Sequence, residues 1–382
     1  MDTEVDSLQT ELARLASLPE SHAQSLAPGF YTSEAWLEAE RRQIFRREWI
    51  CVGRVDEFTN VGDYRVCEID GAPLIVVRRV SGIAAMSAVC RHRLSVIAEG
   101  CGRADGYTCP YHGWTYDLEG RLIAAPRMPA DFDRRSISLP SFPVETWGGF
   151  VYVNLDAQAT SLGERLQPLE ELLAPYHIER MRTLTRQRHV WKTNWKVLVE
   201  NFLEPYHLNV THRGTLATFA APEGVAVLPR HAAFHFHRFR MLDTARPVPL
   251  DPRIGIPNSD LDDERRMTAC IGGIFPSHVL SVTWDAVFWM SLQPQGVDEV
   301  VVDVGLAGPF AFPQNETPDP EHPNLYYLKL IDAVNAEDRP RVESVQRGAR
   351  SGLGQSSRLH PHEAQIAGFI AYLNSRLALP DA

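Results

Sequence analysis

Hydrophobic and polar positions follow different patterns in the two parts of the chain. Between residues 49 and 155, short β-rich runs such as 73–77 and 149–153 are separated by Gly, Asp and Pro at intervals of roughly ten residues. This pattern predicts a small antiparallel β domain. Ahead of it, apolar residues from 36 to 45 recur at helical spacing behind Ser33, a residue type that favours helix N-termini. The N-terminal part therefore predicts an amphipathic lead-in helix.

The second part of the chain combines helical and strand patterns. Helical spacing covers 162–173, 191–212 and 364–377, and strand-like runs fill 226–308, including 233–239 and 300–304. Because the helices are grouped around the strands instead of alternating with them, we expect an α+β fold with an antiparallel sheet. The patterns divide the chain into a lead-in at 1–45, a β domain at 46–155 and an α+β domain at 156–382.

Composition narrows the class of protein. With 382 residues, 44% of them apolar and 23% charged, the chain is long enough for two hydrophobic cores. A net charge of −10 gives no general basic surface for nucleic acid or an anionic membrane, so the expected partners are small molecules or proteins. The N-terminus lacks the features of a secretory signal, and no run of about 20 apolar residues occurs, which predicts a cytoplasmic protein.

Two pairs of metal-binding residue types lie within a short stretch of the β domain. Cys90-Arg-His92 is followed after 16 residues by Cys109-Pro-Tyr-His112, and each pair is short enough to occupy one loop. Two thiolates and two imidazoles on two loops can hold a [2Fe–2S] cluster, in which histidines on one iron raise the reduction potential. A zinc ribbon is the alternative, but zinc sites favour Cys-x₂₋₄-Cys and His-x₃₋₅-His pairs.

A second candidate metal site lies in the segment 194–212. His207 and His212 are five residues apart, which on a regular helix places them about 140° around the axis, a poor arrangement for one ion. Pro205 removes a helical donor and biases Glu204 away from helical angles, so a break can re-aim the two imidazoles. Two histidines and one carboxylate are the usual ligands of Fe(II) in oxygenases. Taken alone, the pair is also compatible with ordinary polar or half-buried histidines.

The sequence around both sites resembles that of Rieske-type non-haem iron oxygenases. Residues 90–93 and 109–120 resemble the two cluster loops of that family, and Glu-Asn-x-x-Glu-x-Tyr-His-x₄-His at 200–212 resembles the form found in oxygenases of glycine betaine, carnitine and stachydrine. The resemblance covers residues 25–378 and implies an all-β Rieske domain followed by a helix-grip, START-like catalytic domain. Leu94 departs from the glycine usual there, and Pro205 departs from the cysteine common in those amine oxygenases.

The resemblance implies two cofactors, with residues carried over by position. The [2Fe–2S] cluster is expected on Cys90, His92, Cys109 and His112. A mononuclear Fe(II) is expected on His207, His212 and Asp338, with Glu337 and Asp332 as alternatives to Asp338.

Two further residues of the 200–212 segment are expected at the active site. Glu204 is expected to link cluster and iron by accepting hydrogen bonds from His112 and His207, which would orient both imidazoles. Asn201 belongs to the same motif and is taken as a catalytic candidate with it.

Aromatic residues predict part of a substrate pocket. Residues 281–290 have the composition of one strand, which would place Trp284 and Phe288 on one face, and Phe202 is a further candidate. These rings can hold a cationic amine by cation–π attraction or stack a flat substrate, whereas ordinary core packing is the simpler alternative.

Four other histidines carry weaker signals. His235 and His237 alternate along one strand face, where they can in principle bind metal but are expected to line the cavity or the sheet surface. His360 and His362 precede the last helix and are expected to be structural.

The resemblance implies a monooxygenase that uses O₂ to hydroxylate or N-dealkylate a small substrate, such as an amine or a quaternary ammonium compound. An aromatic ring dioxygenase that forms cis-diols is the alternative within the same class, and Glu204 argues against it because those enzymes commonly have aspartate there. A non-catalytic Rieske protein that transfers electrons or binds a ligand is the alternative from another class.

The partners follow from the same resemblance and from the charge pattern. No flavin or nicotinamide fingerprint occurs, so electrons are expected from a separate NAD(P)H-dependent reductase, directly or through a ferredoxin. Residues 76–135 contain nine arginines and six acidic residues, and this local excess of positive charge predicts a docking face for an acidic reductase. The homotrimer of the family is expected, with the cluster of one subunit near the iron of the next.

Overall fold

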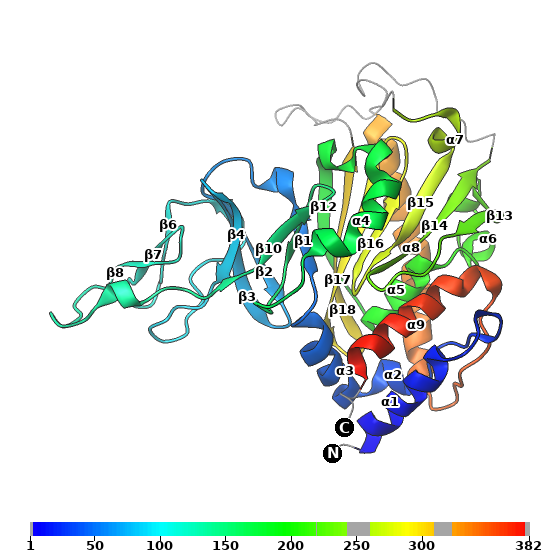
Figure 1. Ribbon diagram of the computed structural model, residues 1–382, viewed down its shortest axis with the longest axis horizontal. Helices are drawn as coiled ribbons and strands as arrows, with labels where there is room; N and C mark the ends of the chain where they lie inside the picture. The colour runs from blue at the N-terminus through cyan, green and yellow to red at the C-terminus, as the bar shows by residue number, and fades with distance from the viewer. Residues whose placement is uncertain (1–2, 219, 243–259, 309–322, 379–382) are drawn as a thin grey trace. The chain divides into compact units, whose positions relative to one another are not determined.

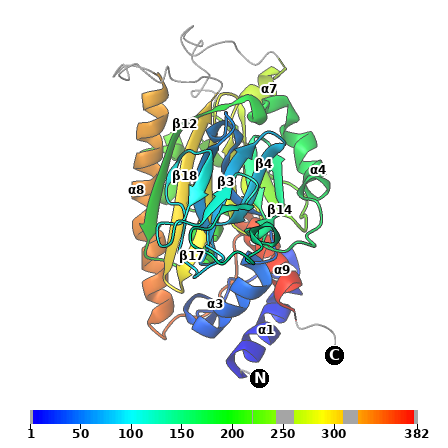
Figure 2. The same ribbon diagram turned by 90° about the vertical axis from the view of Figure 1, so that its left-hand side faces the viewer.

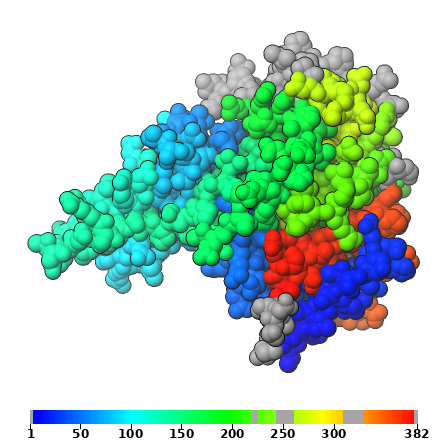
Figure 3. All heavy atoms as spheres, in the orientation of Figure 1, coloured from blue at the N-terminus to red at the C-terminus, as the bar shows by residue number. Residues whose placement is uncertain are grey.

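The computed structural model describes residues 3–218, 220–242, 260–308 and 323–378, and it divides into two compact units (Figure 1). One unit is Phe45–Glu164, and the other combines Met1–Ile44 with Arg165–Ala382. In the second unit, helix α1 (Thr3–Ala16) lies beside the last helix, α9 (Ala364–Leu377), on the molecular surface (Figure 3). Gln9 Nε2 donates a hydrogen bond to Leu377 O at 2.8 Å.

The unit Phe45–Glu164 consists of small antiparallel sheets, as predicted. Its strands pair in the orders β1-β11-β10, β5-β2-β3-β4-β9 and β6-β7-β8. The strands are β1 (Ile50–Arg54), β2 (Asp63–Ile69), β3 (Ala72–Arg79), β4 (Gly82–Ser87), β5 (Cys101–Arg103), β6 (Gly106–Thr108), β7 (Thr115–Asp117), β8 (Leu122–Ala124), β9 (Ser141–Phe142), β10 (Val144–Trp147) and β11 (Phe150–Val153). Cys90 and Cys109 belong to the same buried cluster as Ile75, Val77 and Met86, so both thiols lie within this core.

The other unit is built on one seven-stranded antiparallel sheet of order β12-β18-β17-β16-β15-β14-β13. Its strands are β12 (Arg182–Trp191), β13 (Ala220–Val227), β14 (Phe234–Met241), β15 (Thr268–Ile274), β16 (His278–Val282), β17 (Val287–Gly296) and β18 (Glu299–Gly308). The other α-helices in the described residues are α2 (Gly29–Thr32), α3 (Glu34–Glu40), α4 (Leu162–Leu173), α5 (Trp195–Leu203), α6 (Leu208–Thr211), α7 (Asp263–Arg266) and α8 (Pro323–Arg350). None of the described helices is both long and apolar enough to cross a membrane.

Helices cover one face of the seven-stranded sheet. A Cβ atom on Gly273 of β15 would lie 3.2 Å from Leu203 of α5, and a Cβ on Gly368 of α9 would collide with the ring of His235 on β14. Since Gly273 and His235 are paired across neighbouring strands, α5 and α9 contact the same face. Helix α8 runs along the edge of this sheet at which β12 and β18 lie (Figure 2). The α+β fold expected from the sequence is confirmed.

Several sequence-predicted elements occur where expected. Ser33 caps α3, and its hydroxyl accepts a hydrogen bond from Trp36 N at 3.2 Å. The helix predicted at 162–173 is α4, and the one predicted at 364–377 is α9.

Two predicted elements differ from the structure. The helix expected over 191–212 begins only at Trp195, because Trp191 ends β12 and Asn194 caps α5. The single strand expected over 281–290 is wrong: β16 ends at Val282 and β17 starts at Val287. The side chain of Thr283 donates to Asp285 Oδ1 at 3.0 Å, and Thr283 N donates to Ala286 O at 2.9 Å. These local hydrogen bonds compete with the strand and close a turn.

The start of α5 is anchored by buried polar groups. Lys196 and Glu40 are both fully buried, and their charged groups lie 2.7 Å apart. The other oxygen of Glu40 accepts the indole N–H of Trp195 at 2.8 Å. Asn194 N donates to Gln346 Oε1 of α8 at 3.0 Å, and Gln346 Nε2 donates to Tyr31 O at 3.0 Å. These contacts fix α5 against α3 and α8.

The buried ion pair predicts a large and specific loss of stability. Lys196→Met leaves the Glu40 carboxylate buried without a counter-charge, so we expect the free energy of unfolding to fall by about 3–5 kcal/mol. In Glu40→Gln/Lys196→Met both charges are gone and Trp195 keeps an acceptor, so most of the loss should be recovered. Urea unfolding followed by tryptophan fluorescence measures both. Equal destabilisation of the single and double variants would contradict the role of the charge pair.

Candidate metal centres

The two predicted cluster loops have the same backbone turn. In each loop the residue four positions after the cysteine has positive φ, at +63° for Leu94 and +73° for Gly113. Each donates its N–H to the carbonyl of its cysteine, at 3.1 Å for Leu94 and 3.0 Å for Gly113. Glycine adopts this conformation without strain, whereas an L side chain is disfavoured there. The departure noted at Leu94 is therefore a strained position, and the leucine side chain is 77% exposed.

The four predicted cluster residues are arranged with sulfur inside and imidazole outside. Cys90 and Cys109 are buried, whereas His92 and His112 are exposed with ring centroids 4.6 Å apart. The ring of His92 stacks on Trp114 at 4.7 Å. This donor set suits a cluster with one iron between two buried thiolates and the other between two outer imidazoles.

The surroundings of the two thiols are polar despite their burial. Tyr116 Oη lies 3.3 Å from Cys90 Sγ and accepts the N–H of Arg91 at 3.0 Å. Burial raises the pKa of the Cys109 thiol, but hydrogen bonds with the backbone N–H groups of Tyr111 and His112 and with the side chains of Cys90 and Ser95 together outweigh it, so this pKa lies below its ordinary value. A lowered pKa favours the thiolate, which is the form that ligates iron.

The break predicted at Pro205 separates two helices. Helix α5 ends at Leu203, Glu204 has extended angles (φ −119°, ψ 140°), and α6 begins after His207. Glu204 holds the turn with its own carboxylate: Oε2 accepts the backbone N–H groups of Tyr206 and His207, and Oε1 lies 2.5 Å from Nδ1 of His207. The turn thus fixes the ring of His207 together with its backbone.

Three predicted iron ligands converge from two segments of the chain. Nε2 of His207 and Nε2 of His212 are 3.2 Å apart, and Asp338 Oδ1 of α8 lies 3.7 Å and 3.1 Å from them. All three donor atoms lie within 4.8 Å of one another. Two imidazoles and one carboxylate with their donor atoms this close together match the donor set of an Fe(II) facial triad.

The Nδ1 atom of each imidazole, on the side of the ring away from Asp338, is hydrogen-bonded to a carboxylate. His212 Nδ1 lies 2.8 Å from Glu337 Oε2, which also accepts the hydroxyl of Thr215 at 2.6 Å. Burial lowers the pKa of His212, but Asp338 and Glu337 outweigh it and raise this pKa above its ordinary value. Carboxylates that accept Nδ1–H leave the Nε2 lone pair available for a metal, the usual arrangement around metal-binding histidines.

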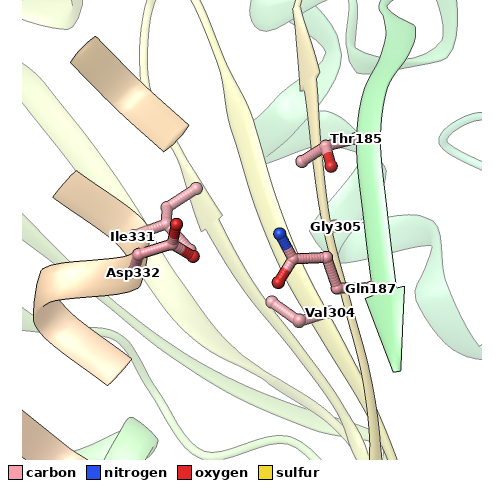
Figure 4. A pocket seen from close by; sticks show the side chains of 6 residues that line it. All are labelled: Thr185, Gln187, Val304, Gly305, Ile331 and Asp332. Carbon is pink, nitrogen blue, oxygen red and sulfur yellow. The ribbon is translucent and has the colours of Figure 1, made fainter. Parts of the chain in front are cut away.

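The two alternatives to Asp338 lie elsewhere. Glu337 contacts the opposite nitrogen of His212, as described above. Asp332 faces a small pocket between α8 and the edge of the sheet, lined also by Thr185, Gln187 and Val304 (Figure 4). The geometry therefore favours Asp338, and it gives Glu337 a role that the sequence did not indicate.

Contacts between α5 and α8 bring Asp338 to the histidines. Thr193 Oγ1 donates to Val342 O, one turn beyond Asp338, at 3.1 Å. Gln346, two turns beyond Asp338, accepts from Asn194 N. Both contacts join the start of α5 to α8, so the helix that carries the carboxylate is fixed to the helix that leads into the histidine turn.

The remaining predicted residues are distributed around this site. Asn201 lies half-buried in the last turn of α5. Phe202 and Phe288 stack with centroids 5.9 Å apart, whereas Trp284 lies in the β16–β17 turn and packs against the cluster that contains Leu208 and Phe239. Trp284 thus lies in a turn and not on one strand with Phe288, and Phe288 stacks on Phe202, which was also predicted for the pocket.

The weaker histidine candidates also have defined places. His235 and His237 are buried in β14. His360 stacks on Tyr206 of the iron-site turn, with centroids 4.0 Å apart, and His362 N donates to His360 Nδ1 at 3.1 Å. The stack of His360 on Tyr206 has no signal in the sequence, because the two residues are joined only by the fold.

Two family descriptions match the chain: "Ring hydroxylating alpha subunit (catalytic domain)" over residues 178–379 and "Rieske [2Fe-2S] domain" over residues 48–143. The glycine betaine monooxygenase oxygenase subunit of Chromohalobacter salexigens is 38% identical over 191 residues, which cover 49% of this chain and 43% of that protein. The carnitine monooxygenase oxygenase subunit of Escherichia coli K12 is 34% identical over 198 residues, covering 50% of this chain and 53% of that protein. These matches span about half the length of the curated relatives.

The fold is also found among solved structures. The quaternary ammonium Rieske monooxygenase CntA in complex with L-carnitine is similar with a TM-score of 0.75 and 25% sequence identity, over 94% of this chain and 99% of that chain. The likeness agrees with the expected order of a Rieske domain and a catalytic domain with an antiparallel sheet.

The roles of the two neighbouring carboxylates can be separated by iron binding. Asp338→Ala removes one of three converging donors, so we expect the mononuclear iron to be lost on gel filtration. Glu337→Gln keeps Asp338 and weakens only the support of His212, so affinity for Fe(II) should fall by about 10–100-fold. Iron analysis after anaerobic reconstitution measures both, with cluster absorbance as the internal standard and Asp332→Asn as the matched control. Retention of iron by Asp338→Ala together with its loss from Glu337→Gln would reverse the assignment.

Proposed function

Because the chain belongs to the ring-hydroxylating alpha-subunit family, we propose that it is the oxygenase component of a Rieske monooxygenase that acts on a small amine or quaternary ammonium compound. Hydroxylation or N-dealkylation with O₂ is the proposed reaction. The observation that carries the proposal is the convergence of His207, His212 and Asp338 in a chain that also has a Rieske domain. A non-catalytic electron-transfer protein has no need of such a second site.

The family assigns two cofactors to the chain, a Rieske [2Fe–2S] cluster and a mononuclear iron. When bound, the cluster supplies electrons one at a time and the iron supplies the place where O₂ reacts. The protein residues hold these groups: we assign Cys90, His92, Cys109 and His112 to the cluster, and His207, His212 and Asp338 to the iron. Asn201, half-buried beside this site, stays a catalytic candidate.

Glu204 has two proposed roles. Its carboxylate accepts Nδ1–H of His207 and so fixes the tautomer with Nε2 free. Its second role is the link to His112 of a neighbouring subunit, which would couple the proton positions of two imidazoles that belong to different metal sites. A glutamate suits this link because it already spans the turn between α5 and α6.

The substrate class is inferred from relatives and from aromatic side chains. The relatives described above are named for oxidation of glycine betaine and carnitine. In this chain the stacked Phe202 and Phe288 extend from α5 and β17 and supply ring faces that attract a cationic ammonium group. The relatives favour an amine over an arene, and the rings suit an ammonium group as well as a flat substrate.

A substrate panel tests the proposed reaction. The iron-loaded enzyme with a reductase is offered glycine betaine, carnitine and γ-butyrobetaine beside naphthalene and biphenyl. We expect an amine to stimulate NADH consumption and O₂ uptake, with release of formaldehyde or another aldehyde when an N-alkyl group is removed. Formation of a cis-diol from an arene, with no turnover of amines, would establish the ring dioxygenase alternative instead.

The proposed electron donor is a separate NAD(P)H-dependent reductase, directly or through a ferredoxin. Arg91 and Arg93 flank the cluster ligand His92, both are exposed, and the guanidinium of Arg93 lies over the ring of Tyr111 at 5.4 Å. Their positive charge would attract an acidic partner to the point where electrons enter.

Charge reversal tests this docking face. Arg91→Glu/Arg93→Glu should slow cluster reduction by an acidic reductase about tenfold or more at low salt, and flatten its dependence on ionic strength. Stopped-flow absorbance of the cluster measures the rate. Arg180→Glu, at an exposed arginine of the other unit, is the matched control. An unchanged rate in the double variant would exclude these arginines from docking.

A homotrimer is the proposed assembly. Large apolar side chains are exposed beside both metal sites: Leu94 and Tyr111 near the cluster residues, and Tyr206 and Val210 near His207. Exposed apolar groups gathered at functional positions are typical of interaction surfaces, and the next subunit is the proposed occupant. A cytoplasmic location stays a prediction from the sequence.

A further inference from the structure

Glu200 is an acidic residue of α5 that lies four residues before Glu204. Its side chain is only partly exposed, and both of its carboxylate oxygens accept the hydroxyl of Tyr31 on α2, at 3.1 Å for Oε1 and 2.8 Å for Oε2. The contacts that join α5 to α8 and the contacts that hold the iron ligands do not involve this carboxylate. Glu200 therefore has a defined partner but no part in holding the ligands.

The groups around Glu200 carry more negative than positive charge. The buried Lys196–Glu40 pair is close by, with Lys196 Nζ 5.9 Å from the ring centre of Tyr31. Burial raises the pKa of Glu200 to about 7. The Tyr31 hydroxyl and the charge of Lys196 oppose this rise, and the charges of two carboxylates, Glu363 and Glu40, add to it. Glu200 is thus a mixture of acid and carboxylate at neutral pH.

Glu363 connects this region to the iron-site turn. Its Oε2 accepts the backbone N–H of His360 at 2.5 Å, and the ring of His360 stacks on Tyr206 of that turn. Burial raises the pKa of Glu363 against the hydrogen bond from His360, and the charge of Glu204 adds to the rise. The charge of His207 acts on the same carboxyl in the opposite direction. Glu363 therefore lies within electrostatic reach of both partners of the Glu204–His207 contact.

This arrangement couples the proton of Glu200 to the charge of the iron site. Charges in partly buried surroundings are screened less than in water, so a change of charge at one group shifts the proton affinity of its neighbours. By linkage, a cation that lowers the pKa of Glu200 is itself bound more tightly when Glu200 is ionised. Because its side chain is partly exposed, Glu200 can exchange its proton with water.

We propose that Glu200 is a positioning residue that buffers the charge of the iron site: it releases a proton to water when a cation binds there and takes one up when the site becomes more negative. It acts through Glu363 and Glu204 and not by contact with a ligand. The inference rests on the iron site of the proposed function and adds a regulation of that site. An oxygenase that receives electrons one at a time passes through states of different charge, and a group half-protonated at neutral pH offsets such changes.

The test compares the Fe(II) affinity of the wild type and Glu200→Gln across neutral pH, in the cluster-loaded enzyme under anaerobic conditions. A unit or more below its pKa, Glu200 is neutral like glutamine, so the two Kd values should agree within about twofold. A unit or more above it, loss of the carboxylate should raise the Kd about three- to tenfold. The ratio of the two Kd values should therefore rise in one step near neutral pH, and protonation of the ligands cancels in this ratio.

Two further variants should move the step in opposite directions. Tyr31→Phe removes a hydrogen bond that stabilises the carboxylate of Glu200, so the step should move to higher pH. Glu363→Gln removes a neighbouring negative charge, so the step should move to lower pH. Each ratio is measured within its own background, with and without Glu200→Gln. A packing defect changes affinity at every pH and moves no midpoint.

Infrared spectroscopy follows the proton itself. The C=O stretch of a protonated carboxyl group should titrate near neutral pH in the wild type, be absent from Glu200→Gln, and titrate at lower pH when Fe(II) is bound. Glu343→Gln, on α8, is the matched control for the affinity measurement. Although burial raises the pKa of Glu343, its hydrogen bonds with the Arg339 side chain and Lys192 N hold it below the ordinary value. The Kd ratio of this control should not change across neutral pH.

The inference and the proposed function can fail separately. If the Kd ratio has no step, or if the band assigned to Glu200 does not titrate near neutral pH, the inference fails whatever the enzyme oxidises. If Glu200→Gln weakens iron binding equally at every pH, Glu200 is a structural residue and the inference is overturned. If the step and the band are present but no substrate of the panel is turned over, the charge coupling stands and the proposed monooxygenase function fails. Absence of Fe(II) binding at every pH would overturn both.

Discussion

The carboxylate of Glu204 is the constraint on which the iron site depends. On an unbroken helix, His207 and His212 would point about 140° apart and could not present their nitrogens to one ion. Pro205 allows the helix to break, but a break alone does not choose a conformation. Glu204 chooses it by accepting two backbone N–H groups of the turn and the ring N–H of His207 at once. One side chain therefore determines both the path of the backbone and the direction of the His207 ring.

The rest of the unit positions this turn. Helix α5 is fixed at its start by the buried Lys196–Glu40 pair, and Gln346 joins it to α8, two turns from Asp338. The sheet supports α5 from below, where Gly273 leaves room for Leu203. A buried ion pair, amide hydrogen bonds and a close approach to the sheet thus fix α5 at different points. As a result, His207 and His212 meet Asp338, which is distant in the sequence. The site is a property of the whole unit and not of the motif alone.

Local signals explain which parts of this structure could be predicted from the sequence. The Ser33 cap, the helix 162–173 and the break at Pro205 depend on residues a few positions apart, so their patterns are visible in the chain. The hairpin at 283–286 was missed because a threonine and an aspartate turn the backbone within a run that otherwise has strand composition. That error placed Trp284 on a strand instead of in the turn.

Contacts between distant segments could not be predicted in the same way. Asp338 was identified only by resemblance, because its meeting with His207 depends on how α8 packs against α5. Glu337 was considered as a ligand, and no local pattern shows that its carboxylate lies behind His212. His237 Nδ1 is buried and has no hydrogen-bond partner among the described residues. The sequence does not show this, because the partners of a buried polar atom depend on all its neighbours in three dimensions. The site roles themselves remain proposals that rest on this geometry.

Three carboxylates, from Glu204, Glu337 and Asp338, crowd around two imidazoles in a partly buried space. Like charges held together at low dielectric repel one another, and a divalent cation removes that repulsion. A ligand that binds only the folded state stabilises it by mass action, so an ion held by these residues would also stabilise the packing of α5, α6 and α8. A metal ion bound by these residues would therefore make resistance to proteolysis depend on metal occupancy.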